Sequence, residues 1–339
     1  MSIRTINLNI IKMKNYILLS AFSILSIACN NDDKDSKPAH PTLQEKYTIN
    51  EIGVYPEGID YDSKNEKFVY GSMYKGTIYS LSPKGEIKSF ATSSKLVLPT
   101  GIFTDEVRNR LIVANADLGI SQKSTEGSAG SVATVAIFNL DTGVLIKEID
   151  LKNFTPGAGS CLNDIAVDSN GIIYVTDSFS PVIYKIDSNY TASVFLNNAL
   201  FQPAAGAFGL NGIVFHPDGY LLAAKSDSAK IFKIPLSNPQ NITEVSGMQF
   251  TSPDGIELDR NNNLIVIENG LGLGKSYTFK STDNWTSASN VSETNIGKDE
   301  FPTTAALASD GNVYVISSKL GKLLGGDKSQ STFVIQKIK

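Results

Sequence analysis

Six oxygen-bearing side chains recur along this sequence, each at the start of a short apolar segment. Carboxylate, amide and hydroxyl oxygens are hard donors, which calcium prefers, and magnesium or manganese less often. Their spacing is roughly 40 to 60 residues, and they are Glu57, Thr100, Asn163, Asn211, Asp254 and Thr303. The pattern predicts that Glu57, Asn163, Asn211 and Asp254 bind one divalent ion. Thr100 and Thr303 would leave one side open for water or substrate.

Each position also has a purely local explanation, because Asn and Asp beside Gly are common turn residues. What separates the two interpretations is whether the six residues meet. That depends on the elements that carry them.

Segments with strand character alternate with turns along most of the chain. They are rich in Val, Ile, Tyr and Phe and are bounded by Gly, Asn, Asp and Ser. No segment shows a convincing helical period. The predicted strands are Lys67–Ser72, Gly76–Leu81, Arg110–Asn115, Val132–Asn139, Ile172–Thr176, Val182–Ile186, Tyr220–Ala224, Lys230–Ile234, Asn263–Glu268, Ser276–Phe279, Asn312–Ser317 and Thr332–Lys337.

A repeat of this length is typical of a propeller blade of four antiparallel strands. We therefore expect an all-β fold, a six-bladed β-propeller, in which the same position of every blade lines one central channel. Residues 46–53 form a lone strand before the first repeat, and the last repeat is one strand short. We expect residues 46–53 to complete the last blade and to cover its open edge.

The expected topology also predicts which loops share a face. The six oxygen-bearing residues start the innermost strands, and long segments rich in Gly and Ser should lie on the same face. Long loops gathered at one end of a scaffold commonly form binding sites, although tolerated insertions with no role are the alternative. These segments are 117–131, 155–161, 197–209, 270–275 and 319–331.

The ordered set Glu-Gly, Asn-Asp, Asn-Gly and Pro-Asp-Gly resembles the SMP-30/gluconolactonase family of calcium-dependent six-bladed propellers. The resemblance covers nearly all of residues 54–318 and implies that Glu57, Asn163, Asn211 and Asp254 surround the ion. Two features depart from the family. Glu57-Gly58 is followed by Ile59 rather than Pro, and Ser160-Cys161-Leu162 stands where an Arg often contacts substrate hydroxyls.

Two functions follow from this pattern. The first is a calcium-dependent hydrolase of a lactone or related ester, in which the ion polarises the carbonyl and Asp254 acts as general base or nucleophile. Asp164 would then support the ion from behind Asn163, or else cap its blade. The second is a non-catalytic cell-surface propeller that binds a glycan, peptide or protein partner. A histidine-dependent mechanism, as in paraoxonase-like propellers, is not expected, because the sequence has only His40 and His216.

The N-terminus has the features of a bacterial lipoprotein. Lys12 and Lys14 precede an apolar stretch too short to span a bilayer, and the sequence before Cys29 resembles a lipobox. The resemblance implies a signal peptide over residues 1–28, with Met1 or Met13 as the start, and lipidation of Cys29. Residues 29–44 would be a disordered tether. Its acidic run, residues 32–35, resembles the surface-export signal of Bacteroidetes lipoproteins, or else is a solvated spacer.

The composition argues against a nucleic-acid partner and against an intramolecular disulfide. The net charge is −4 and no basic stripe is present, so nucleic acid is not an expected partner. With Cys29 lipidated, Cys161 has no partner for an intramolecular disulfide. Residues 45–339 are long enough for one large domain. We expect a monomer attached to the outer membrane only through its lipid.

Overall fold

The computed structural model describes residues 41–155 and 159–338. The predicted signal peptide, Cys29 and the first part of the tether lie outside these residues. These described residues all belong to one compact unit, and only this unit is described below. None of the helices in the described residues is long and apolar enough to span a bilayer.

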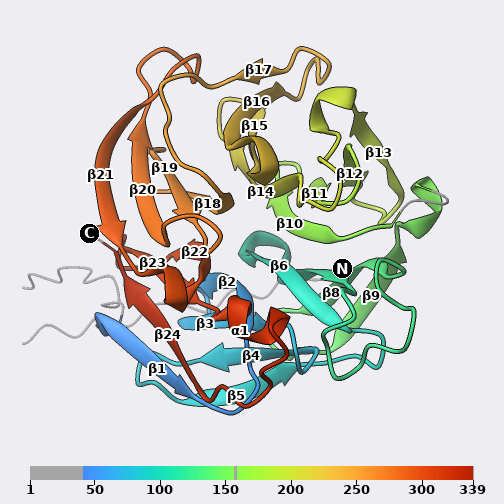
Figure 1. The fold of residues 1–339 in the computed structure, drawn as a ribbon, viewed down its shortest axis with the longest axis vertical. Coiled ribbons are helices and arrows are strands. Elements are labelled where there is room, and N and C mark those ends of the chain that lie inside the picture. Colours follow the sequence, from blue (N-terminus) through green and yellow to red (C-terminus); the bar gives the residue numbers. More distant parts are fainter. Residues whose placement is uncertain (1–40, 156–158, 339) are drawn as a thin grey trace, which may run out of the picture. The chain divides into compact units, whose positions relative to one another are not determined.

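The described residues form six four-stranded antiparallel sheets, which are the blades of a β-propeller (Figure 1). Blade 1 contains β2 (Pro56–Asp62), β3 (Lys67–Ser72), β4 (Thr77–Leu81) and β5 (Ile87–Ala91). Blade 2 contains β6 (Leu98–Asp105), β7 (Arg110–Ala116), β8 (Ala133–Asn139) and β9 (Leu145–Asp150). Blade 3 contains β10 (Leu162–Val167), β11 (Ile173–Asp177), β12 (Val182–Ile186) and β13 (Ala192–Asn197).

Blades 4 to 6 complete the ring. Blade 4 contains β14 (Leu210–His216), β15 (Tyr220–Lys225), β16 (Lys230–Pro235) and β17 (Thr243–Glu244). Blade 5 contains β18 (Pro253–Leu258), β19 (Leu264–Glu268), β20 (Lys275–Lys280) and β21 (Ser289–Asn295). Blade 6 contains β22 (Pro302–Leu307), β23 (Val313–Ser317), β24 (Thr332–Lys337) and β1 (Lys46–Asn50). The innermost strands β2, β6, β10, β14, β18 and β22 contact one another in sequence, and β22 contacts β2. The six-bladed fold predicted from the sequence is therefore confirmed.

The ring is closed by the two ends of the described chain. β1 pairs antiparallel with β24, from Lys46 opposite Gln336 to Asn50 opposite Thr332. Buried aromatic rings hold this blade against blade 1, since the Phe68 ring lies 5.7 Å from that of Tyr47 and 5.0 Å from that of Tyr314. The predicted closure is confirmed, although the strand ends at Asn50 rather than at residue 53.

The predicted strands agree with the structure to within one or two residues at each end. The expectation of no helix was wrong at one place. A five-residue helix, α1 (Leu320–Leu324), follows β23, and it is too short for a helical period to appear in the sequence. The described chain also contains short 3-10 turns at Glu106–Arg108, Lys152–Phe154, Ala199–Phe201, Ser226–Ser228 and Lys298–Glu300.

Every innermost strand has a β-bulge at the same place. In β10 the pairing with β11 shifts register between Leu162 and Ile165, and in β14 it shifts between Leu210 and Ile213. The other four innermost strands have the same irregularity. The residues inside each shift are a predicted ring residue and its neighbour. Bulges re-aim side chains locally, and at these bulges Glu57, Asn163, Asn211 and Asp254 turn toward the channel.

The glycine that follows several ring residues has a packing role rather than a turn role. A Cβ atom on Gly212 would lie 2.6 Å from the carbonyl oxygen of Asp254 in the next blade, and one on Gly101 would lie 2.5 Å from the carbonyl oxygen of Asn163. Real Cβ atoms do not approach backbone this closely. Neither glycine has a positive φ, so the close approach of neighbouring strands is what requires glycine here.

Candidate functional site

A cavity of about 450 Å³ lies at one end of the channel, and we call it the ring cavity. Glu57, Asn163, Asn211 and Asp254 all line it, and they come from the innermost strands of blades 1, 3, 4 and 5. The structure therefore brings together the four residues that the sequence singled out as metal ligands. All four side chains are buried.

Serine residues of the second strands fix the orientation of both asparagine side chains. The Nδ2 atom of Asn163 donates to Ser178 Oγ at 3.1 Å, and that hydroxyl donates to the carbonyl of Leu210 at 2.6 Å. Asn211 Nδ2 likewise donates to Ser226 Oγ at 3.0 Å. Because each serine proton is already used, the serine can only accept from the amide, which leaves both Oδ1 atoms as acceptors for the cavity.

The Oδ1 atom of Asn211 is buried and has no hydrogen-bond partner among the described residues. A buried acceptor without a partner is costly. A cation in the ring cavity would satisfy it.

The two carboxyl groups have a strongly unfavourable environment when charged. Burial raises the pKa of Glu57 well above its usual range, and the nearby Asp254 and Asp164 carboxylates raise it further. Burial also raises the pKa of Asp254, to about 7, although hydrogen bonds from Asn269 and Asn211 act in the opposite direction. No Lys, Arg or His of the described chain lines the ring cavity. A bound cation would supply the missing positive charge.

The donor set fits a hard divalent cation, since it consists of two carboxylates and two amide oxygens. Three or more His, Cys, Asp or Glu side chains do not gather as a metal cluster anywhere in the described residues. Amide oxygens make up half of the ring set, so only two of its four members are carboxylates.

The two threonine hydroxyls both bond to backbone of a neighbouring blade. Thr100 Oγ1 donates to the carbonyl of Leu162 at 2.8 Å, and Thr303 Oγ1 donates to the carbonyl of Glu57 at 2.9 Å. Each hydroxyl therefore links its blade to the next one around the ring. Thr100 lines the ring cavity, whereas Thr303 is 0% exposed and is not part of its lining in the described chain.

All five long segments predicted to share the face of the ring residues contribute to the cavity wall. Their contributions are Leu118, Cys161, Phe208 with its neighbours Gly206 and Ala207, Leu271, and Leu320 with Leu324 of α1. The sequence prediction of a loop-covered face is confirmed. Asp227 and Phe301 complete the wall from shorter connections.

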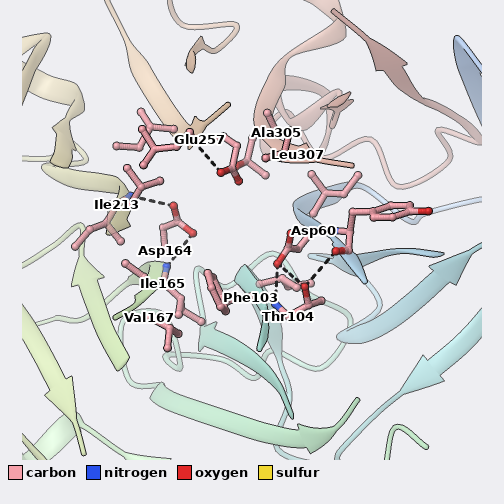
Figure 2. Close-up of a pocket in the computed structure, with 18 of the residues that line it drawn as sticks. Asp60, Phe103, Thr104, Asp164, Ile165, Val167, Ile213, Glu257, Ala305 and Leu307 are labelled. Atoms are coloured by element: carbon pink, nitrogen blue, oxygen red, sulfur yellow. Dashed lines mark hydrogen bonds between the residues drawn. The ribbon is translucent and has the colours of Figure 1, made fainter. Parts of the chain in front are cut away.

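Asp164 lies further along the channel, toward its opposite end (Figure 2). Its Oδ1 accepts from the Ile165 amide at 2.8 Å, and its Oδ2 accepts from the Ile213 amide at 3.0 Å. Both bonds pin backbone, one within its own blade and one to blade 4. This geometry corresponds to the capping alternative for Asp164, because neither bond reaches a ring residue.

The opposite end of the channel is a second cavity of about 310 Å³. Figure 2 shows the carboxyl groups of Asp60, Asp164 and Glu257 facing its open centre. Burial raises the pKa of Asp60 to about 6 and that of Asp164 to about 7, and it raises the pKa of Glu257 well above its usual range. The sequence analysis did not identify Asp60 or Glu257.

His216 lies away from the ring cavity. Its ring stacks on Tyr220 with 4.4 Å between centroids, and burial lowers its pKa. His40 lies outside the described residues. The sequence analysis also missed Ser178, Ser226 and Asn269, which orient Asn163, Asn211 and Asp254 respectively. A usable signal exists, because each of the three directly follows a charged residue at the end of its second strand.

Comparison with known proteins agrees with the fold. Residues 55–272 match the family model described as the SMP-30/Gluconolactonase/LRE-like region. No curated relative matches the sequence. The Malassezia sympodialis allergen Mala s 1 has a similar structure, with a TM-score of 0.70 and 18% identity over 88% of this chain and 97% of the allergen.

Two bacterial structures are also similar. A gluconolactonase of Xanthomonas campestris has a TM-score of 0.59 and 12% identity over 88% of this chain and 91% of its own. A calcium-binding regucalcin of Agrobacterium tumefaciens has a TM-score of 0.58 and 15% identity over 86% of this chain and 94% of its own. At these identities the likeness shows the propeller fold alone.

Proposed function

The chain belongs to the SMP-30/gluconolactonase/LRE-like family, and we propose that it is a calcium-dependent hydrolase of a lactone or related ester. The observation that carries the proposal is the buried Asn211 Oδ1, which has no partner in the described chain and lines the ring cavity with Glu57 and Asp254. An unpaired acceptor beside two buried carboxyl groups, with no cationic side chain in the lining, is the electrostatic pattern of a cation site.

Glu57, Asn163, Asn211 and Asp254 would hold the ion. All of their donor atoms are oxygens, which favours calcium, with magnesium or manganese as alternatives. When bound, a divalent cation supplies Lewis acidity toward a substrate carbonyl.

Asp254 is the residue we assign to the chemistry. Its Oδ2 accepts from Asn269 Nδ2 at 2.8 Å, which fixes the carboxyl group in the ring cavity. Acting as general base, Asp254 would take a proton from water while the water oxygen bonds to the acyl carbon. The ring C–O bond then breaks, the proton passes to the released alkoxide, and a hydroxy acid is formed. Acting as nucleophile, Asp254 would bond to the acyl carbon while the ring C–O bond breaks and the released alkoxide takes a proton from water. Water would then hydrolyse the resulting anhydride, which gives the hydroxy acid and restores the Asp254 carboxylate.

The test combines calcium titration calorimetry with a lactone and ester hydrolysis assay on wild type, Glu57→Gln and Asp254→Asn. We expect Glu57→Gln to weaken calcium binding, because it removes one of two neutralising charges. Asp254→Asn should retain binding, since an amide oxygen still coordinates, but should lower hydrolysis ~100-fold or more. Asp299→Asn is the matched control, because it makes the same chemical change at an exposed position.

The outcomes separate the hypotheses. If wild type binds no divalent cation, both the metal site and the hydrolase are wrong. Calcium binding without hydrolysis of any lactone or ester would instead support the non-catalytic alternative, a surface propeller for a glycan, peptide or protein.

We also propose that the protein is an outer-membrane lipoprotein, attached through Cys29 and displayed at the cell surface through its acidic tether. Cys29→Ala should abolish labelling by radioactive palmitate and leave the precursor uncleaved. Unchanged labelling of the Cys29→Ala protein would refute this assignment.

A further inference from the structure

The ring cavity has a polar floor and an apolar wall. The floor is formed by the four predicted metal ligands. Above it, the lining side chains are predominantly hydrocarbon or thioether, and they include Met73, Leu118, Phe208, Phe301, Leu320 and Leu324. All six lie outside the propeller strands, in the connecting segments and in α1, so the wall is built separately from the metal floor.

The polar side chains Ser226 and Ser252 of the wall are already hydrogen-bonded to other groups of the protein. Ser226 accepts from Asn211 and donates to the Pro253 carbonyl at 2.5 Å. Ser252 Oγ donates to Asn269 Oδ1 at 3.0 Å. The wall therefore offers few free groups that could bind a substrate hydroxyl.

The remaining charge in the wall is neutralised. Asp227 pairs with Lys225 and accepts from the Ala204 amide at 2.7 Å. Neither Lys nor Arg lines the cavity within the described residues. A polyhydroxylated substrate would lose its hydration here without replacement hydrogen bonds, which disfavours binding.

Apolar side chains continue from the wall to the solvent at the mouth. Leu271 and Leu324 both line the cavity, yet they are 67% and 48% exposed. Exposed leucines are unremarkable when scattered singly. Here the two leucines extend the apolar cavity outward, so they could contact a ligand whose hydrocarbon chain is longer than the cavity.

We propose that the substrate is a lactone or ester that carries an apolar alkyl or acyl chain, rather than a sugar lactone. The ester group would lie on the floor, and the chain would pack against Leu320, Leu324 and Phe301. The presence of an ester group in the substrate rests on the proposed function, whereas the binding of an apolar chain does not depend on it.

Two measurements on the full chain test the inference. The first compares hydrolysis of δ-valerolactone, δ-decalactone and glucono-δ-lactone in the presence of calcium. Burial of a methylene is worth about three- to fourfold in affinity. Allowing for partial burial of the five-carbon chain, we expect kcat/KM for δ-decalactone to exceed that for either other lactone by ~tenfold or more.

The variant Leu324→Ser should lower kcat/KM for δ-decalactone ~fivefold or more relative to that for δ-valerolactone. Leu200→Ser is the matched control, because Leu200 is 49% exposed and does not line the ring cavity. It should change neither substrate. Equal rates for glucono-δ-lactone and δ-decalactone, or equal loss for both alkyl lactones in Leu324→Ser, would overturn the inference while leaving the hydrolase intact.

The second measurement does not depend on catalysis. The neutral fluorescent probe N-phenyl-1-naphthylamine should bind saturably at one site, be displaced by δ-decalactone, and bind more weakly to Leu324→Ser than to Leu200→Ser. Probe binding without hydrolysis of any lactone would refute the proposed function and support the apolar site. A probe that does not bind, or is not displaced, would refute the apolar site whatever the hydrolysis assay shows.

Discussion

Asn211 Nδ2 donates to Ser226 Oγ at 3.0 Å, and this contact decides which way the asparagine amide faces. Ser226 in turn donates its only proton to the Pro253 carbonyl. Serine therefore cannot donate to Asn211, and the amide oxygen is left facing the ring cavity without a partner. The serine acts on the candidate metal site through the asparagine, although it is not itself a predicted ligand.

Ser226→Ala should therefore weaken calcium binding without removing a ligand. The variant removes one of the two acceptors of the Asn211 NH₂ group, so the amide oxygen is held less firmly toward the cavity. Loss of a group that orients a ligand commonly costs 10- to 100-fold in metal affinity, and we expect a loss of that order in titration calorimetry. Ser228→Ala, an exposed serine in the same turn, should bind as wild type does. Equal affinity of Ser226→Ala and wild type would show that the contact does not orient the ligand.

Thr303→Val should lower the free energy of unfolding rather than change substrate hydrolysis. Its hydroxyl donates to the Glu57 carbonyl at 2.9 Å, between the last blade and the first. Valine has the same shape and leaves that carbonyl without this donor, which costs ~1–3 kcal/mol. Urea unfolding measures the loss. Thr125→Val, at an exposed loop position, is the control and should unfold at the same urea concentration as wild type. If Thr303→Val also unfolds at the wild-type urea concentration, the hydrogen bond contributes nothing to stability.

Removal of residues 45–54 should sharply lower the melting temperature. The deletion removes β1, exposes the edge of β24, and takes away the buried side chains of Tyr47 and Ile49. Shortening the tether by residues 31–38 is the control and should leave the melting temperature unchanged. Differential scanning calorimetry compares the two. If the protein without residues 45–54 has the same melting temperature as wild type, the closure of the ring by β1 is assigned incorrectly.

Asp60→Asn should make stability less dependent on pH. Burial raises the folded pKa of Asp60 from 3.8 to about 6, so the folded chain binds this proton more tightly than the unfolded chain. The contribution of Asp60 to stability is therefore full below about pH 4 and is lost as pH rises through about 6. Wild type should lose on the order of 3 kcal/mol more stability than the variant across that window.

The comparison is made by urea unfolding at several pH values. Glu106, Asp164 and Glu257 are present in both proteins, so to first order their own titration cancels. The amide should cost a constant amount at every pH, because it cannot accept from both Tyr61 and Thr104 as the carboxylate does. Parallel stability curves for the two proteins would contradict the raised pKa.

The ring residues could be predicted from the sequence because a strict structural repeat marks them. Glu57, Asn163, Asn211 and Asp254 each sit at the bulge of an innermost strand, and the repeat places the bulge at the same point in every blade. The closure by β1 could be predicted for a similar reason, since one strand was missing at the end and one was spare at the beginning.

The residues that orient the ring could not be predicted from the repeat. Ser178, Ser226 and Asn269 occupy equivalent places after their second strands, but blades 1 and 2 have Met73 and Asp117 there. The residue type at this position varies too much to mark it across the six blades, and the charged residue that precedes it in blades 3, 4 and 5 is not repeated in blades 1 and 2. Their role becomes visible only when the second strand lies beside the first.

Asp164 shows a second limit, which is the direction of side chains within a bulge. It is adjacent to Asn163 in sequence, and adjacency suggested a shared role. The bulge between Leu162 and Ile165 sends the two side chains to different parts of the channel. Whether two neighbours diverge in this way depends on backbone geometry that residue types do not encode.

The pairing of β1 with β24 also sets the order of events during synthesis. The salt bridge between Glu45 and Lys337 joins residues 292 positions apart, so the first strand of the propeller to leave the ribosome waits for the last. Until Thr332–Lys337 is available, β1 has no partner and the circle of blades stays open. Contacts this distant in sequence form slowly and leave edges exposed meanwhile. Nascent chains that stall or terminate before residue 332 should therefore be recognisable to proteases and chaperones as unfinished, whichever blades they already contain.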